Sequence, residues 1–277
     1  MHLKLQSFVV VIFWVVASIN SSVAQGVEYE LKFEGRWQSS LPRPGSAHFT
    51  RIIGSTHRSG DSFLTFGQGV SLGVENVAET GSVGALPDEI NAAVASGNAG
   101  SLILGTDGFI SPEETNTFRF SATPGYSQLS FITMIAPSPD WFVGVHDLEL
   151  RSVNGVWIDQ IELDLENYDA GTENGTGLSL NNQATNPLGV IELLDSAEPD
   201  GALFGSGSIS RLTLTRTSDA PEIRLGDCNL DGRLNFLDIT AFISILSDSG
   251  YLVEADTNED KVVDFLDISP FILLLSS

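Results

Sequence analysis

The C-terminal end of this chain carries an internal duplication. Residues 227–247 (DCNLDGRLNFLDITAFISILS) and residues 256–276 (DTNEDKVVDFLDISPFILLLS) align at an offset of 29, with 11 of 21 positions identical. Each copy starts with alternating Asp and Asn residues and ends in an apolar run. The two copies are expected to form one small C-terminal domain over residues 226–277.

The polar half of each copy has the spacing of a calcium loop. Calcium takes six to eight hard oxygen ligands, and a 12-residue loop supplies them from alternate positions. Both copies carry oxygen side chains at loop positions 1, 3, 5, 9 and 12, and position 7 would add a backbone carbonyl. The predicted ligands are Asp227, Asn229, Asp231, Arg233, Asn235 and Asp238 in the first loop, and Asp256, Asn258, Asp260, Val262, Asp264 and Asp267 in the second.

The two loops differ at position 6, where the backbone turns sharply. Gly232 fills it in the first loop and has no Cβ to clash. Lys261 fills it in the second loop, where it is expected to strain the turn, add a positive charge and weaken calcium binding. The alternative for both loops is a pair of metal-free Asp- and Asn-rich turns that cap two helices.

An apolar helix is expected after each loop, with no helix before it. Apolar residues repeat there at helical spacing, and Pro270 falls in a first turn, where its missing N–H costs little. The two sets are Ile239, Phe242, Ile243 and Leu246, then Ile268, Phe271, Ile272 and Leu275. A calcium loop followed by a helix, repeated twice, resembles a dockerin type I module. The resemblance implies calcium-dependent folding and docking to a cohesin-like protein.

The helix starts depart from that family because Phe236-Leu237 and Phe265-Leu266 make them unusually apolar. Docking to a cohesin-like partner is one use of these residues. Docking onto the main domain of the same chain, or onto another surface protein, is a second. The two phenylalanines could also pack the copies against each other.

The N-terminus predicts export. Lys4 precedes the apolar run FVVVIFWVVASI (8–19), and Ser22-Val23-Ala24 places small residues before a cut at Gln25. A membrane anchor is the alternative, although the run is short for a span. No second run of spanning length follows. Cys228 is the sole cysteine, so no intrachain disulfide can support an exported fold.

The net charge of the chain limits the kinds of molecule that it can bind. The chain has 36 Asp and Glu against 13 Lys and Arg, a net charge of −23. Such a surface repels phosphate groups, which argues against binding to nucleic acid. The same surplus of carboxylates suits hard cations such as Ca²⁺.

Residues 25–217 are expected to form an antiparallel β-sandwich, joined by a linker at 218–225 to the C-terminal domain. Short β-branched and aromatic runs alternate with Gly, Pro and Asn turns throughout this region. Only residues 88–97 predict a helix, with Asp88 as its cap. The fold class is therefore mainly β, with a small C-terminal α-helical domain of two calcium loops.

Three segments in this region point to a family. They are PSPDWFVGV (137–145), GVWID (155–159) and YDAGTENG (168–175), in that order. Together they resemble a spondin domain, the N-terminal part of spondin and mindin matrix proteins, over roughly residues 26–217. The resemblance implies a β-sandwich with a calcium site at one end, whose ligands here would be Asp140, Asp169 and Glu173. Glu173 replaces the usual Asp and would bind in bidentate fashion or through water. The disulfides of animal members cannot form here.

The residues support this site independently. Three carboxylates on loops at one end of a sandwich would repel each other unless a cation neutralised them. The alternative is turn chemistry, since Asp after Pro and before Ala-Gly both favour tight turns. Trp141 and Trp157 are expected to pack in the core or at its rim rather than to bind a ligand.

The sequence gives little support for a catalytic site. GVSLG (69–73) fits a nucleophile elbow, but no helix is expected after Ser71. His48 and His57 are expected in strands or turns. Glu162 and Asp164 alternate on one strand face, which favours a solvated face over a glycosidase pair.

These patterns predict a secreted, calcium-binding adhesion or interaction protein. The sandwich would present a binding surface, and the tail would dock to a cohesin-like, cell-surface or matrix partner. Because dockerins are mostly bacterial, the combination implies a bacterial source. Two alternatives stay open: a dockerin-bearing carbohydrate-active enzyme, and a matrix protein that binds polysaccharide.

Overall fold

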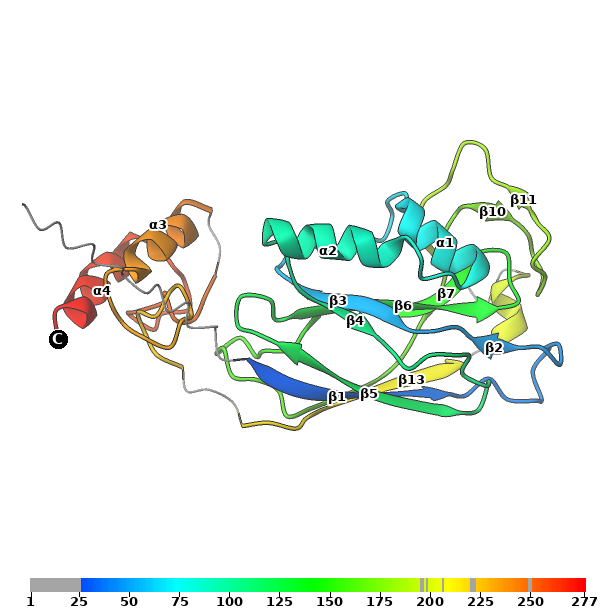
Figure 1. Ribbon diagram of the computed structural model, residues 1–277, viewed down its shortest axis with the longest axis horizontal. Coiled ribbons are helices and arrows are strands. Elements are labelled where there is room, and N and C mark those ends of the chain that lie inside the picture. The colour runs from blue at the N-terminus through cyan, green and yellow to red at the C-terminus, as the bar shows by residue number, and fades with distance from the viewer. Residues whose placement is uncertain (1–25, 195–196, 198, 206, 220–222, 249–250) are drawn as a thin grey trace, which may run out of the picture.

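A computed structural model of the chain describes residues 26–194, 197, 199–205, 207–219, 223–248 and 251–277. The predicted export signal at 1–24 and part of the predicted linker at 218–225 lie outside these residues. The elements between Val27 and Arg216 are mainly antiparallel strands, as predicted, and helices follow at the C-terminal end (Figure 1). Within the described ranges, no helix has the length and apolar character needed to cross a bilayer.

The first sheet has four antiparallel strands in the order β5-β1-β13-β8. Side chains in a strand alternate between its two faces. In β1, Val27, Tyr29, Leu31 and Phe33 are accordingly buried, whereas the residues between them are exposed or half-buried. One face of this sheet therefore closes the core, and the other meets solvent. The strands are β1 (Val27–Gly35), β5 (Thr115–Ala122), β8 (Gln160–Asp164) and β13 (Ser210–Arg216).

The second sheet runs in the order β12-β9-β7-β6-β3-β4, with β2 paired to β6. His48 lies in β2 and His57 in β3, as the sequence predicts. Trp141 and Trp157 are buried in the core between the sheets, which confirms their packing role. The strands are β2 (His48–Phe49), β3 (Ile53–His57), β4 (Ala99–Leu104), β6 (Gln128–Ala136), β7 (Trp141–Glu149), β9 (Asn167–Asp169) and β12 (Glu192–Leu193).

Helices α1 (Leu72–Thr80) and α2 (Leu86–Ser96) cover the outer face of the second sheet (Figure 1). This third layer explains why β6 is buried on both faces. Phe131 of β6 packs into the core between the sheets. Its neighbour Ile132 packs instead with Phe142 of β7 and the apolar side of the helices.

The prediction of a single helix at 88–97 was wrong in two ways. Helix α2 begins at Leu86, so Asp88 lies in its first turn and Ala85 is the N-cap. Helix α1 was missed, and it follows Ser71 directly. The Ser71 hydroxyl accepts the Val74 N–H at 3.2 Å and donates to Glu89 at 2.5 Å, so Ser71 is a helix cap tied to α2.

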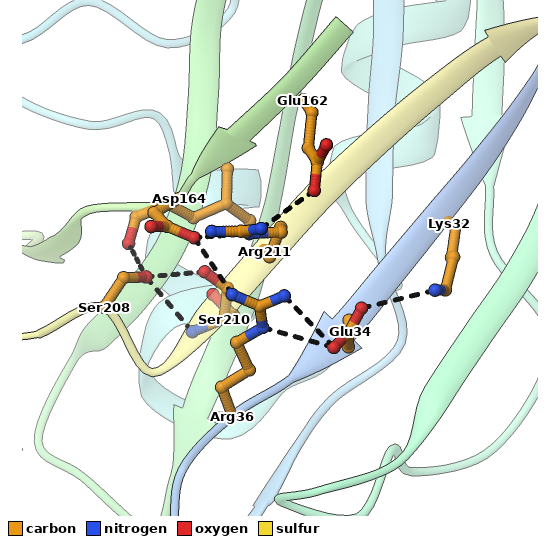
Figure 2. A network of polar contacts seen from close by, with 9 residues as sticks. Lys32, Glu34, Arg36, Glu162, Asp164, Ser208, Ser210 and Arg211 are labelled. Carbon is orange, nitrogen blue, oxygen red and sulfur yellow. Dashed lines mark hydrogen bonds and ion pairs between the residues drawn. The ribbon is translucent and has the colours of Figure 1, made fainter. Parts of the chain in front are cut away.

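Glu162 and Asp164 lie on the solvent face of the first sheet, as predicted. Arg211 of β13 donates to Glu162 at 2.8 Å and to Asp164 at 2.6 Å, and Arg36 links Asp164 to Glu34 of β1 (Figure 2). The Arg211 guanidinium keeps the pKa of Asp164 below its usual value. These two carboxylates are therefore members of a charged network across three strands.

The C-terminal domain contains α3 (Asp238–Asp248), the short η2 (Phe265–Asp267) and α4 (Ile268–Leu275). Phe242 of α3 stacks on Phe271 of α4, with ring centres 4.1 Å apart and planes 13° apart. Phe236 and Phe265 are 77% and 82% exposed. The hypothesis that these two residues pack the copies together was therefore wrong. The two copies contact each other through Phe242 and Phe271 instead.

Substitution of Ile132 by Ala tests the third layer. Ile132 is fully buried between the sheet and the helices, so the free energy of unfolding should fall by about 2–5 kcal/mol. Urea unfolding measures this loss. Thr117→Val on the solvent face of β5 is the control and should change the free energy by less than about 0.5 kcal/mol. Equal effects of the two substitutions would contradict burial of this face under α1 and α2.

Candidate metal centres

The two C-terminal loops fold by the same hydrogen bonds at their first residues. Asp227 accepts backbone N–H groups from Asp231 at 3.0 Å and from Gly232 at 2.8 Å. Asp256 accepts the equivalent groups of Asp260 at 3.1 Å and Lys261 at 2.8 Å. Each carboxylate thereby draws loop positions 5 and 6 toward position 1.

The last residues of the loops are also equivalent. Asp238 accepts the N–H of Asn229 at 3.1 Å and of Asn235 at 2.8 Å. Asp267 does the same with position 3 of its loop at 3.0 Å and position 9 at 2.9 Å. In the second loop, the bond to position 9 is one half of a capping box at the start of η2. One side chain thus closes the loop and starts the helix.

The backbone conformations of the loops match as well. Leu230 and Glu259, at loop position 4, have φ of 60° and 62°. Gly232 and Lys261, at position 6, have φ of 79° and 72°. Lys261 therefore adopts the left-handed conformation that glycine adopts freely and that strains a residue with a Cβ. The expected strain in the second loop is confirmed, and weaker calcium binding there stays a prediction.

Four carboxylates in these loops are buried. Asp227, Asp238, Asp256 and Asp267 are at most 5% exposed. Burial raises the pKa of Asp227 to about 6, and the charges of Asp238 and Asp231 act in the same direction. None of the four buried carboxylates forms an ion pair with Lys or Arg in the part of the chain that the structure describes. A bound cation would provide the missing positive charge.

The other centre lies at one end of the sandwich, where β6 turns into β7. Asp140 in this turn is fully buried. Its Oδ2 accepts the Thr172 N–H at 2.6 Å, the Thr172 hydroxyl at 3.1 Å and the Glu173 N–H at 3.0 Å. Its Oδ1 is buried without a hydrogen-bond partner. Burial raises the pKa of Asp140, the direction expected for a carboxylate that lacks a compensating charge.

Asp169 and Glu173 reach the same end of the sandwich from the next turn. Asp169, the last residue of β9, accepts the Gly171 N–H at 2.7 Å and the Trp141 indole N–H at 3.1 Å. Burial raises the pKa of Asp169 to about 6, and the charge of Asp140 adds to the effect. Glu173 opens a two-stranded sheet of β10 (Glu173–Asn174) and β11 (Gln183–Ala184). Asp169 and Glu173 both line an open hollow of about 310 Å³.

Glu79 of α1 is a further acidic residue at this centre, and the sequence reasoning missed it. Burial raises its pKa first, and the nearby charges of Glu173, Glu75 and Asp140 raise it further. The residue was overlooked because its helix was overlooked. Val74, Val77 and Ala78, which have the spacing of one buried helix face, were the signal that could have placed it.

The residues at both places carry the carboxylate and amide oxygens that a hard cation takes as ligands. The orphaned Oδ1 of Asp140 is the plainest sign, because a buried carboxylate oxygen without a partner is costly. Across the described residues, no three acidic, His or Cys side chains are gathered closely enough to form an assembled metal centre. Many of these oxygens face backbone N–H groups instead. Coordination would therefore need these side chains to turn away from the N–H groups and toward the ion.

Sequence comparison adds a family to this geometry. The Spondin_N domain family matches residues 27–204, a range that includes Asp140, Asp169 and Glu173. The chain belongs to the spondin family. Spondin-2 of Homo sapiens is 32% identical over 209 residues, which are 70% of this chain and 62% of that protein. Spondin-1 of Gallus gallus is 30% identical over 181 residues, 62% of this chain and 22% of its own length.

This chain thus spans less than two thirds of either spondin relative. The spondin match ends at residue 204, before the duplicated loops begin at Asp227. The dockerin-like reading of the tail therefore depends on the two loops themselves.

Substitution of Lys261 by Gly tests the strain in the second loop. The change removes the Cβ at a φ of 72° and should raise the free energy of unfolding by about 1 kcal/mol. Urea unfolding of the full chain in a calcium chelator measures the gain. Lys261→Ala is the matched control, since it removes the charge but keeps the Cβ. If Lys261→Ala stabilises the chain as much as Lys261→Gly does, charge and not backbone strain is the cause.

Proposed function

We propose that this protein is a secreted, calcium-binding adhesion or protein-interaction protein. Its spondin domain presents a binding surface, and its dockerin-like tail docks or tethers the molecule. The observation that carries this proposal is the repeated set of loop hydrogen bonds. Two loops 29 residues apart in sequence adopt one conformation, including a left-handed Lys261 in the place of Gly232. Turns without a shared role need not keep a strained residue in this way.

In this proposal the loops bind Ca²⁺ through the side chains at positions 1, 3, 5, 9 and 12 and the carbonyl at position 7. The sandwich binds a third Ca²⁺ through Asp140, Asp169 and Glu173. The unpaired buried Oδ1 of Asp140 supports the sandwich site. The burial of Asp227, Asp238, Asp256 and Asp267, which have no Lys or Arg partner among the described residues, supports the other two. Calcium would neutralise the buried carboxylates and fix the loop conformations. The protein partner would be recognised by side chains on the surface of the chain and not by the ion.

The tail carries an apolar surface suited to a protein partner. We define the docking face as Phe236, Leu237, Phe265 and Leu266, which are 77%, 69%, 82% and 66% exposed. Large apolar side chains exposed on a folded domain favour contact with a protein partner. The two pairs stand at equivalent positions of the duplicated unit, directly before the last loop ligand. The partner proposed is a cohesin-like protein or a cell-surface or matrix component.

A hydrolase function has less support. The carboxylates that most resemble a glycosidase pair, Glu162 and Asp164, are both bonded to Arg211 on an open sheet face. A glycosidase needs two carboxylates on opposite sides of a scissile bond. The Ser71 hydroxyl, the candidate nucleophile, caps helix α1 by accepting the Val74 N–H.

Calcium titration by calorimetry on the chain from Gln25 tests the proposal. Three sites are expected in the unaltered chain. Asp140→Asn should leave two, since it removes a ligand charge at the sandwich. Asp227→Asn combined with Asp256→Asn should leave one. Asp164→Asn, an exposed carboxylate in the charged network, is the matched control and should leave all three. A chain that binds no calcium at the duplicated loops would refute the dockerin-like function.

A further inference from the structure

The C-terminal domain is joined to the sandwich by a buried ion pair. Arg151, which follows β7, donates from Nη2 to Glu254 at 2.9 Å, and both side chains are less than 10% exposed. Arg151 also donates from Nε to the Gly155 carbonyl at 2.7 Å. Its guanidinium lies 5.6 Å from the ring centre of Trp157. The arginine is thus fixed on the sandwich by two contacts before it meets the carboxylate.

Shape complementarity accompanies the ion pair. Gly155 has a φ of +71°, and a Cβ there would lie 2.1 Å from a side-chain carbon of Val253. Only glycine permits this approach. Tyr251, Leu252 and Val253 line a hollow of about 240 Å³ together with Pro124 and other residues of the sandwich. We call residues 251–254 the latch segment.

The latch segment is also part of the second calcium loop's framework. The Glu254 carbonyl accepts the Gly226 N–H at 2.7 Å, directly before the first residue of the first loop. The Leu252 carbonyl accepts the N–H of Asp256, the first residue of the second loop, at 3.2 Å. Ala255 between them is fully buried. The backbone that presents Glu254 to Arg151 therefore also positions the first ligand of each loop.

We propose that the latch is coupled to calcium: occupancy of the C-terminal loops holds the tail on its own sandwich, and loss of calcium releases it. This inference rests on the proposed calcium loops. Calcium in the second loop would fix the backbone after Glu254, and calcium in the first loop would fix Gly226, whose N–H bonds to the Glu254 carbonyl. Together they would present the Glu254 carboxylate to Arg151. By reciprocity, a docked Arg151 must tighten calcium binding in the loops by the same factor.

The ion pair makes the docking of the tail an all-or-none event. Removing one member of a buried pair leaves the other charge buried without compensation, which is strongly unfavourable. Arg151 and Glu254 are therefore stable either together in the contact or both in solvent. The docking face is exposed in the docked state, so the latch orients the tail for a partner without covering that face.

Arg151→Met tests the coupling, because Arg151 belongs to the sandwich and is not a loop ligand. In calorimetry on the chain from Gln25, the variant should bind calcium at the C-terminal loops at least about fivefold more weakly, with the Asp140 site unchanged. Arg119→Met is the matched control. Arg119 is an exposed arginine of β5 paired with Glu30, and its loss should leave every affinity unchanged. Small-angle scattering should show a larger radius of gyration for Arg151→Met in calcium than for the unaltered chain.

Glu254→Gln provides a second variant from the other side of the contact, should Arg151→Met fold poorly. It should reproduce the weaker loop affinity and the larger radius. If the unaltered chain binds calcium at the loops and neither variant changes that affinity or the radius, the coupling is wrong and the proposed function stands. If the unaltered chain binds no calcium at the loops, the proposed function fails and the coupling fails with it.

Discussion

Burial of carboxylates that have no Lys or Arg partner in the described part of the chain is the constraint on which this structure depends. The chain has 36 acidic residues for 13 basic ones, and several of its acids lie inside the protein instead of in water. Asp140 and Asp267 are fully buried, and Asp227 is 5% exposed. Backbone N–H groups satisfy many of their oxygens but add no net positive charge. A bound cation would neutralise this buried negative charge.

The architecture concentrates this charge in two separate regions. In the sandwich, the β6–β7 turn and the turn after β9 bring Asp140 and Asp169 to the end near β10 and β11 (Figure 1). The duplicated loops lie beyond the opposite end, beside α3 and α4. Among the described residues, Glu254 is a buried carboxylate that does have a cationic partner, Arg151. This ion pair joins the tail to the sandwich, together with the packing of Gly155 against Val253.

The β-strands, the duplicated loops and the spondin resemblance could be predicted from sequence because the patterns that indicate them are local. Loop spacing, the alternation in β1 and the PSPDW segment each depend on a few neighbouring residues. Helix α1 was missed, since no helix was expected after Ser71. In the fold, a Cβ at Gly73 would lie 2.7 Å from the Leu86 Cα, so this glycine allows the two helices to approach closely. Glu79 was lost with that helix.

The contact between Arg151 and Glu254 could not have been predicted by the same reasoning. The two residues lie 103 positions apart, and neither belongs to a motif. Their pairing depends on the packing of Gly155 against Val253, which only a three-dimensional fold reveals. The exposure of Phe236 and Phe265 could not be predicted for the same reason. The sequence shows that these residues are apolar, but it does not show whether they face a core or solvent.

Anomalous diffraction from crystals of the chain grown with calcium tests the central claim most directly. The account predicts three peaks, one within coordination distance of Asp140 and one inside each duplicated loop. Each peak would lie beside carboxylates that are otherwise buried without compensation. Crystals that diffract well and show no peak at either loop would contradict it, and the buried aspartates would then serve only as turn and helix caps.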